Sequence, residues 1–206
     1  MLNRQYQAAE NLLYYSLFPF PMLKKRKANL SVLKGLKDYV ALAIIDAQKY
    51  KEANIGIVKE LVKDNIPGVY VTLNRPYDNL KRIFEKEKMN MHNVIFIDAV
   101  TKTAGSRTEK TEDCLFIGSS ENLSDISIAM DQAIMAIPQK EKFLFFDSLS
   151  TLLLYNDVEV VAKFIHFLSG KMRIWKVRGI IISLRRENDK DLITQLKSLC
   201  DVTLEL

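Results

Sequence analysis

The chain has 206 residues, of which 48% are hydrophobic, enough to bury one full α/β core with a modest extension or, as a second option, two small domains. No apolar run approaches the roughly 18 residues that a membrane-spanning helix needs, and the first residues lack the compact apolar run of a secretory signal. Cys114 and Cys200 lie far apart without metal-ligand spacing, which disfavours a disulfide framework and favours ordinary thiols in a cytoplasmic protein.

The net charge of +5 comes from the first third of the chain. Residues 1–66 contain 11 Lys and Arg against 6 Asp and Glu, whereas the remainder contains 19 of each. The densest basic run consists of Lys24, Lys25, Arg26 and Lys27. Such a run can contact nucleic acid, an acidic protein or anionic lipid. Because no aromatic residue interrupts it, we interpret it as a solvated linker and keep the contact surface as the alternative.

Residues 1–38 differ in pattern from the rest of the chain, and we treat them as an N-terminal helical extension in front of an α/β domain at 39–206. Apolar residues recur in the extension at intervals of three or four, which predicts an amphipathic helix. They are Leu2, Tyr6, Ala9, Leu13, Leu17 and Phe20. The FPFP sequence ends this helix. Such a helix packs most often on its own domain or on a neighbouring subunit, and its lysine-poor polar side disfavours peripheral membrane contact.

The α/β domain alternates predicted strands and helices. Strands are expected at 40–45, 68–73, 93–98, 142–148, 178–184 and 201–206. Helices are expected at 54–64, 77–88, 122–137, 158–175 and 189–199. The strand segments are apolar without alternation, which is typical of a parallel sheet covered on both faces. The order predicts a doubly wound, mostly parallel sheet with helices on both faces. The polar stretch 99–118 is longer than a plain connector, so we expect a functional or mobile loop there.

Two local stretches carry a resemblance to a known family. FLFFDSLSTLLLY, at 143–155, has four apolar residues, an aspartate and a serine, and GVYVTLNRPYDNLKRIF, at 68–84, has a strand followed by an amphipathic helix. With the element order, they resemble the ATPase core of KaiC-like proteins of the RecA superfamily over roughly residues 40–206. The resemblance implies a P-loop NTPase fold, in which Asp147 and Ser148 are the remnant of the second nucleotide motif (Walker B).

The phosphate loop that the resemblance implies departs from the family pattern. The family's first strand feeds G-x-x-x-x-G-K-[ST], whose glycines let backbone N–H groups converge on phosphates. On that frame Asp46 and Lys51 occupy the glycine positions, while Glu52 and Ala53 replace the lysine and the hydroxyl residue. These side chains would crowd the cradle, and the carboxylates would repel a triphosphate. Taking Lys49 or Lys51 as the phosphate lysine still leaves no glycine for the close approach.

The carboxylates that would activate water are also replaced. Where the family strand ends in two acidic residues, this chain has Asn74 and Arg75. Arg75 cannot accept a proton, and Asn74 can orient a water molecule but cannot act as a base. We interpret Asp147 as a structural acceptor in preference to a metal ligand. The combined changes predict a protein without catalysis, without an ATP or Mg²⁺ cofactor and without a metal site.

A second basic feature comes directly after the strand predicted at 178–184. Arg185 and Arg186 lie where parallel α/β sheets bind ligands, so they can face an anion there. The favoured interpretation is that they pair with acidic residues nearby in the sequence. These are Glu187, Asp189 and Asp191.

The first functional hypothesis is a non-catalytic RecA/KaiC-like domain, a pseudo-ATPase that acts as a regulatory or scaffolding protein with a protein partner or as a homo-oligomer. The second is a nucleic-acid-binding accessory protein of the recombinase-paralogue kind, based on the basic first third with Arg185 and Arg186. The third is an ATP-binding KaiC-like ATPase with an atypical phosphate loop, in which Lys49 or Lys51 meets phosphate and Asp147 meets magnesium.

Overall fold

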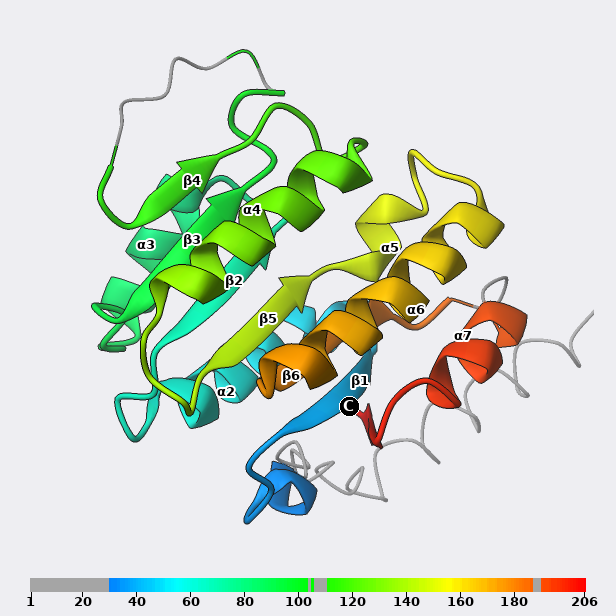
Figure 1. Cartoon of the computed structure of the whole chain (residues 1–206), viewed down its shortest axis with the longest axis horizontal. Helices are drawn as coiled ribbons and strands as arrows, with labels where there is room; N and C mark the ends of the chain where they lie inside the picture. Colours follow the sequence, from blue (N-terminus) through cyan, green and yellow to red (C-terminus); the bar gives the residue numbers. More distant parts are fainter. Residues whose placement is uncertain (1–29, 104, 106–110, 187–189) are drawn as a thin grey trace, which may run out of the picture.

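A single seven-stranded parallel sheet organises the domain (Figure 1). The structure, a computed structural model, describes residues 30–103, 105, 111–186 and 190–206. The strand order is β4-β3-β2-β5-β6-β1-β7, and every neighbouring pair is parallel. The predicted N-terminal helix and the basic run at 24–27 lie outside the described residues.

The strands are β1 (Tyr39–Ile45), β2 (Gly68–Thr72), β3 (Val94–Asp98), β4 (Cys114–Phe116), β5 (Phe143–Asp147), β6 (Arg178–Leu184) and β7 (Val202–Glu205). The α-helices are α2 (Tyr50–Val62), α3 (Tyr77–Lys86), α4 (Leu123–Ala136), α5 (Leu149–Leu152), α6 (Val158–Trp175) and α7 (Lys190–Lys197). Two short 3-10 helices are η1 (Leu30–Leu33) and η2 (Ala47–Lys49).

Helices cover both faces of the sheet. One hydrophobic cluster packs α4, α5, α6 and α7 against one face, and a second packs η1, α2 and α3 against the other. Every residue of β1, β2 and β5 is buried, which explains why these strands do not alternate between apolar and polar residues. The predicted doubly wound α/β fold is therefore confirmed.

The structure differs from the sequence predictions in three elements. β4 lies inside the polar stretch 99–118, and α5 follows β5 directly where only a loop was expected. The helix predicted at 54–64 begins earlier, at Tyr50, and η2 precedes it. The polar first turn of α2 hides its beginning, because Lys51 and Glu52 are exposed and break the apolar pattern. A three-residue strand such as β4 is too short to show a period.

The two cysteines are free thiols, buried at Cys114 and half-buried at Cys200, as expected from the sequence. Burial raises the pKa of Cys200 to about 11 and that of Cys114 further still. Both therefore remain protonated near neutral pH, which keeps them poor nucleophiles. Within the described ranges, no helix is long and apolar enough to cross a membrane.

Gly68 permits the close packing of β2 on β5. A Cβ atom at this position would lie 2.3 Å from Cδ1 and 2.4 Å from Cγ of Phe143, a ring that is itself completely buried. The ring cannot move aside without displacing other core side chains. By contrast, a Cβ atom at Gly56 on α2 meets nothing within 4 Å.

We therefore expect Gly68→Ala to lower the free energy of unfolding by about 1–3 kcal/mol, because the added methyl group overpacks the core. Gly56→Ala is the matched control, and it should raise stability by about 0.5–1 kcal/mol because alanine favours the helix. Urea denaturation of both variants measures the difference. Equal effects of the two substitutions would contradict this account of the packing.

Candidate functional site

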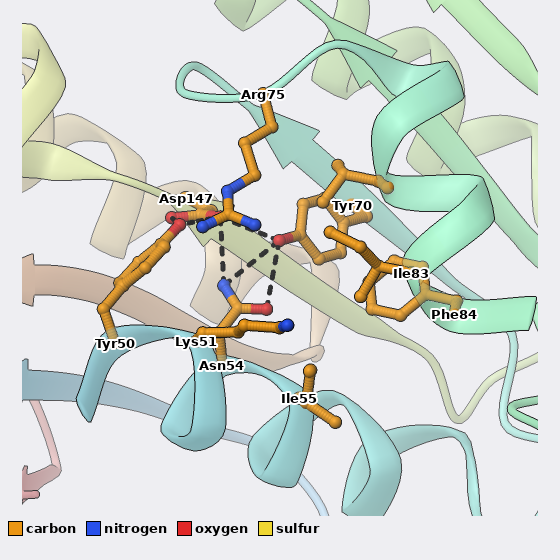
Figure 2. A pocket seen from close by; sticks show the side chains of 10 residues that line it. Tyr50, Lys51, Asn54, Ile55, Tyr70, Arg75, Ile83, Phe84 and Asp147 are labelled. Atoms are coloured by element: carbon orange, nitrogen blue, oxygen red, sulfur yellow. Dashed lines mark hydrogen bonds between the residues drawn. The ribbon is translucent and has the colours of Figure 1, made fainter. Parts of the chain in front are cut away.

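The carboxyl ends of β2 and β5 meet beside α2, and this edge holds the candidate site. Asp147 ends β5, is completely buried and lies in register with Thr72 at the end of β2. Its carboxylate lies between α2 and β2, where side chains from both elements point toward it (Figure 2). The peptide bond from Asp147 to Ser148 is cis.

Four side chains donate hydrogen bonds to the Asp147 carboxylate. The Tyr50 hydroxyl lies 2.5 Å from both carboxylate oxygens, and the Tyr70 hydroxyl lies 2.7 Å from Oδ2. The amide Nδ2 atoms of Asn54 and Asn74 lie 3.0 Å from Oδ2 and 3.3 Å from Oδ1. We call these five residues the Asp147 cluster. Because a carboxylate offers about four acceptor sites, the chain's own donors fill its capacity.

Local structure explains why these donors converge. Tyr50 and Asn54 are four residues apart on α2, so they face the same side of that helix. Tyr70 points from β2 into an aromatic group in which its ring centroid is 4.9 Å from that of Phe145 and 5.8 Å from that of Phe84. Its ring thus packs in the apolar core while its hydroxyl reaches Asp147, a usual arrangement for a buried tyrosine.

The β2–α3 connection closes the cluster from the solvent side. Asn74 also donates to the Ser148 hydroxyl at 3.2 Å, and its Oδ1 accepts a hydrogen bond from Thr151. The Arg75 guanidinium lies 5.5 Å from the centroid of the Tyr50 ring, within the range of a cation–π contact. Asn74 and Arg75, predicted as the positions of lost catalytic carboxylates, therefore bind and cover the remaining carboxylate.

Burial governs the protonation of the cluster. It raises the pKa of Asp147, and the hydrogen bonds from Tyr50 and Tyr70 oppose this rise. Burial also raises the pKa of both tyrosines, and the neighbouring Asp147 charge adds to that effect. The two phenols therefore remain protonated donors, as the hydrogen bonds require.

The space beside the cluster is too small for a nucleotide. The cavity there has a volume of about 10 Å³ and is lined by residues of α2, β2, α3 and the cluster, with Lys51 and Arg75 among them. A single water molecule needs about 10–15 Å³. Mg²⁺ normally keeps several waters and binds carboxylate together with phosphate, so the residues present do not fit a Mg²⁺-nucleotide at Asp147. Among the described residues, no group of three or more His, Cys, Asp or Glu could hold a metal ion.

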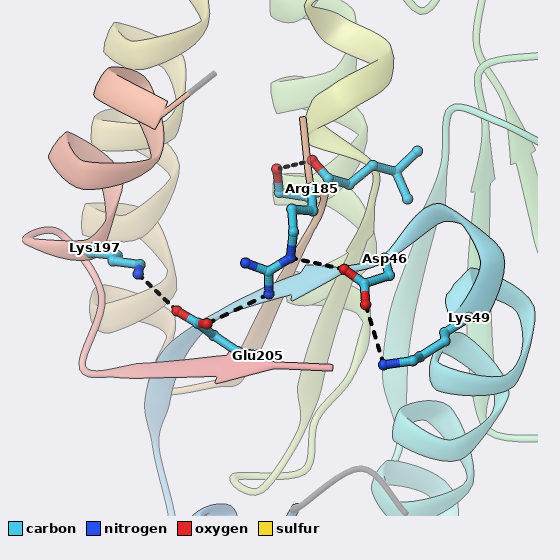
Figure 3. Close-up of polar contacts among 7 residues, drawn as sticks. Asp46, Lys49, Arg185, Lys197 and Glu205 are labelled. Carbon is cyan, nitrogen blue, oxygen red and sulfur yellow. Dashed lines mark hydrogen bonds and ion pairs between the residues drawn. The ribbon is translucent and has the colours of Figure 1, made fainter. Parts of the chain in front are cut away.

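The β1–α2 connection is a tight turn. Asp46 is the single residue between β1 and η2, and its carbonyl accepts a hydrogen bond from the Lys49 N–H at 2.8 Å. The Asp46 carboxylate contacts Lys49 Nζ at 3.2 Å and Arg185 Nε at 2.8 Å (Figure 3). Lys49 and Arg185 lower the pKa of Asp46. Of the residues at the predicted phosphate-loop positions, Asp46 and Lys49 therefore contact each other. Glu52 and the buried Ala53 lie farther along the chain, in α2.

The described contacts of Arg185 are with residues distant in the sequence. Arg185 pairs with Asp46 and, at 3.5 Å, with Glu205, which also binds Lys197. The partners come from distant segments because the Arg185 N–H donates to the Ile45 carbonyl, which brings the arginine beside Asp46. Pairing of Arg185 and Arg186 with Glu187, Asp189 and Asp191 stays a prediction. Two of those, Glu187 and Asp189, lie outside the described residues. Arg186 is exposed.

Three members of the cluster, Tyr50, Asn54 and Tyr70, were not predicted from the sequence. The available signals were weak. Tyr50 and Asn54 have helical spacing shortly after a strand, and Tyr70 carries a hydroxyl in an otherwise apolar strand. Neither signal identifies Asp147 as the acceptor, because that residue follows Tyr50 by 97 positions.

The family was then identified by comparison with known proteins. A family model described as "Family of unknown function (DUF7504)" matches residues 62–206. The chain belongs to the DUF7504 family. A comparison with curated proteins gives no match.

Solved structures support the same fold. A KaiC-like protein, PH0186 of Pyrococcus horikoshii, is 16% identical with a TM-score of 0.57, covering 82% of this chain and 71% of that one. The uncharacterized protein PH0321 of the same organism, solved in complex with an unknown peptide, is 14% identical with a TM-score of 0.63, covering 82% and 77%. At these identities the similarity establishes the KaiC/RecA-like fold of this DUF7504 member and nothing about its activity.

Removing one phenol from the cluster should destabilise the fold. We expect Tyr70→Phe to lower the free energy of unfolding by about 1–3 kcal/mol, because a buried carboxylate loses a donor without gaining water. Tyr155→Phe is the control: Tyr155 is 51% exposed, so its change should stay within about 0.5 kcal/mol. Chemical denaturation compares the two variants, and similar losses from both would refute the structural role of the cluster.

The raised pKa of Asp147 gives a pH test with a defined sign. A carboxyl group whose pKa is higher in the folded state stabilises the fold fully below its unfolded pKa, near 3.8, and this contribution is lost as pH rises through the folded pKa. Asp147→Asn removes that titration. The unfolding free energy of wild type minus that of the variant should therefore fall as pH rises above about 4. A difference that is constant or rises over this window would contradict the shift.

Proposed function

We propose that the protein is a non-catalytic KaiC-like domain, a pseudo-ATPase that serves as a regulatory or scaffolding protein by binding a protein partner. The observation that carries the proposal is the occupied Asp147 carboxylate. Tyr50, Tyr70, Asn54 and Asn74 hold it within hydrogen-bonding distance. A carboxylate in this state has no acceptor site left for a metal ion or for a water molecule bound to one.

Freeing Asp147 for magnesium would carry a large cost. Moving the carboxylate away would break its hydrogen bonds from the Tyr70 hydroxyl and the Asn54 amide, which would then keep only their contacts with each other at 3.1 and 3.3 Å. Each hydrogen bond to a charged group contributes about 1.5–3 kcal/mol. The cluster also ties α2 to β2 and β5, so opening it would separate elements that pack in the core. Magnesium binding at this carboxylate would therefore have to compensate for the disruption of the fold around it.

The β1–α2 connection supports the same proposal. A phosphate cradle needs several backbone N–H groups that point at a common anion, which glycines make sterically accessible. Here the chain enters η2 one residue after β1, and the N–H of Lys49 is bonded to Asp46. The Asp46 carboxylate is paired with Lys49 and Arg185, so the geometry of the connection, more than its charge, disfavours a triphosphate.

A protein partner is the favoured ligand class. The PH0321 structure contains a peptide, which supports peptide binding as a use of this fold without transferring a site to this chain. The nucleic-acid alternative loses part of its basis, because the Arg185 guanidinium already pairs with Asp46 and Glu205. The basic run at 24–27 lies outside the described residues and remains the basis of that alternative.

The proposal predicts that the purified chain neither binds nor hydrolyses ATP. Isothermal titration calorimetry with ATP and MgCl₂ should give no binding heat, and phosphate release should equal the rate without protein. Binding in wild type that Asp147→Ala weakens and Asp125→Ala preserves would establish the atypical ATPase instead. Asp125 suits the control because it is exposed in the first turn of α4, away from the cluster.

A further inference from the structure

One side of the molecule exposes an unusual share of apolar side chains. Eleven large hydrophobic residues are exposed in the described part of the chain, and eight of them lie on α4, on α6 or in the segment that joins α5 to α6. Both helices cover the same face of the sheet (Figure 1). Exposed apolar residues scattered singly need no explanation, but a concentration of them on one helical layer marks an interaction surface.

The apolar side contains a groove between α4 and α6. The groove has a volume of about 450 Å³, and its walls include Ile128 of α4 with Val160 and Phe167 of α6. Lys171 crosses from α6 to Asp131 of α4 with an N–O distance of 2.7 Å. Its ammonium group also lies 5.5 Å from the ring centroids of Phe167 and Trp175. The Lys171–Asp131 ion pair links α6 to α4, whereas Phe167 and Trp175 belong to α6 itself. Because both helices also share one hydrophobic cluster, the groove is part of the folded domain.

The outer side of α6 has the pattern that a packed helix requires. Val160, Lys163, Phe167, Gly170 and Ile174 recur at alternating intervals of three and four, which places them along one stripe. A Cβ atom at Gly170 would meet nothing within 4 Å. The missing side chain leaves room for the backbone of another helix to approach closely. The stripe is therefore suited to an amphipathic helix lying along α6.

We propose that residues 2–20 of this same chain occupy the groove, with residues 2–17 as that helix. Their apolar residues recur at intervals of three and four, the same spacing as the stripe on α6. The helical part, residues 2–17 ahead of FPFP, is about 24 Å long, and the 18 residues of α6 span about 27 Å. The two apolar stripes therefore match in both spacing and length, and packing them together removes both from water.

The path of the chain permits this arrangement. The Tyr39 N–H donates to the Val177 carbonyl at 3.3 Å, so β1 begins beside the end of α6. The first described residue, Leu30, comes nine positions before Tyr39. Leu30 packs on the opposite face of the sheet from α6, so residues 21–29, which can extend over about 30 Å, would pass around the end of the sheet to bring Phe20 to the Ile174 end of the groove. The segment then runs parallel to α6.

This direction also pairs opposite charges. With Leu17, the last apolar residue before FPFP, level with Gly170, the segment places Glu10 close to Lys163, the one charged residue of the α6 stripe and a lining residue of the groove. An antiparallel helix would place Glu10 elsewhere along the stripe and would also need a longer linker. Both considerations favour the parallel arrangement.

The experiment uses the full chain and its single tryptophan, Trp175, which is half-buried at the end of α6. Acrylamide quenching reports the exposure of its ring, and hydrogen exchange reports protection of the amides of residues 2–20. We expect protection of those amides by at least about tenfold. Leu13→Lys should abolish the protection and increase the quenching of Trp175. Asn11→Lys, on the opposite side of the predicted helix, should change neither.

A substitution in the groove gives the reciprocal test. Phe167→Lys should also remove the protection of residues 2–20, whereas Leu115→Lys, at an exposed apolar position on β4, should retain it. If Phe167→Lys fails to fold, as judged by circular dichroism, Leu13→Lys carries the test. Unprotected amides in wild type would overturn the proposal. So would protection that appears only as light scattering detects dimers, which would assign the groove to a second copy.

Discussion

The burial of one carboxylate constrains the whole edge of the sheet. A buried carboxylate is tolerated only when hydrogen-bond donors surround its two oxygens. Asp147 is completely buried. The donors that surround it come from α2, from β2 and from the connection after β2. Each of these elements must therefore keep its position for the others to remain satisfied. The helix that begins after β1 is held against the end of β5 by this requirement.

The Asp147 cluster stabilises the sheet edge at which this fold would be expected to bind a ligand. In a KaiC/RecA-like fold, the carboxyl ends of the parallel strands are where a ligand would be expected. Here the aromatic rings of Tyr50 and Tyr70 and the amide of Asn54 occupy that volume. The contacts that stabilise the domain at this edge are therefore the same ones that fill it. A change that removed these side chains would also weaken the core.

More of the fold than of the candidate site could be predicted from the sequence. Long apolar runs without alternation identify buried parallel strands, and the periodicity of 158–175 gave the bounds of α6 because both of its ends are marked by polar residues. The start of α2 could not be predicted, because its first turn is polar. The partners of Asp147 were hidden for a different reason. They lie on separate elements up to 97 positions away, and only the register of β2 against β5 brings them together.

The two edges of the sheet determine how this domain can associate. β4 has three residues and β7 has four, so each edge offers few unpaired backbone N–H and C=O groups. A foreign strand would gain little from pairing with either edge, and short edge strands of this kind protect natural sheets from edge-to-edge aggregation. Growth by strand addition is therefore disfavoured at both sides. Among the described residues, the helical layers offer the larger surfaces for recognition, where specificity comes from shape and apolar contact instead of a repeating backbone pattern.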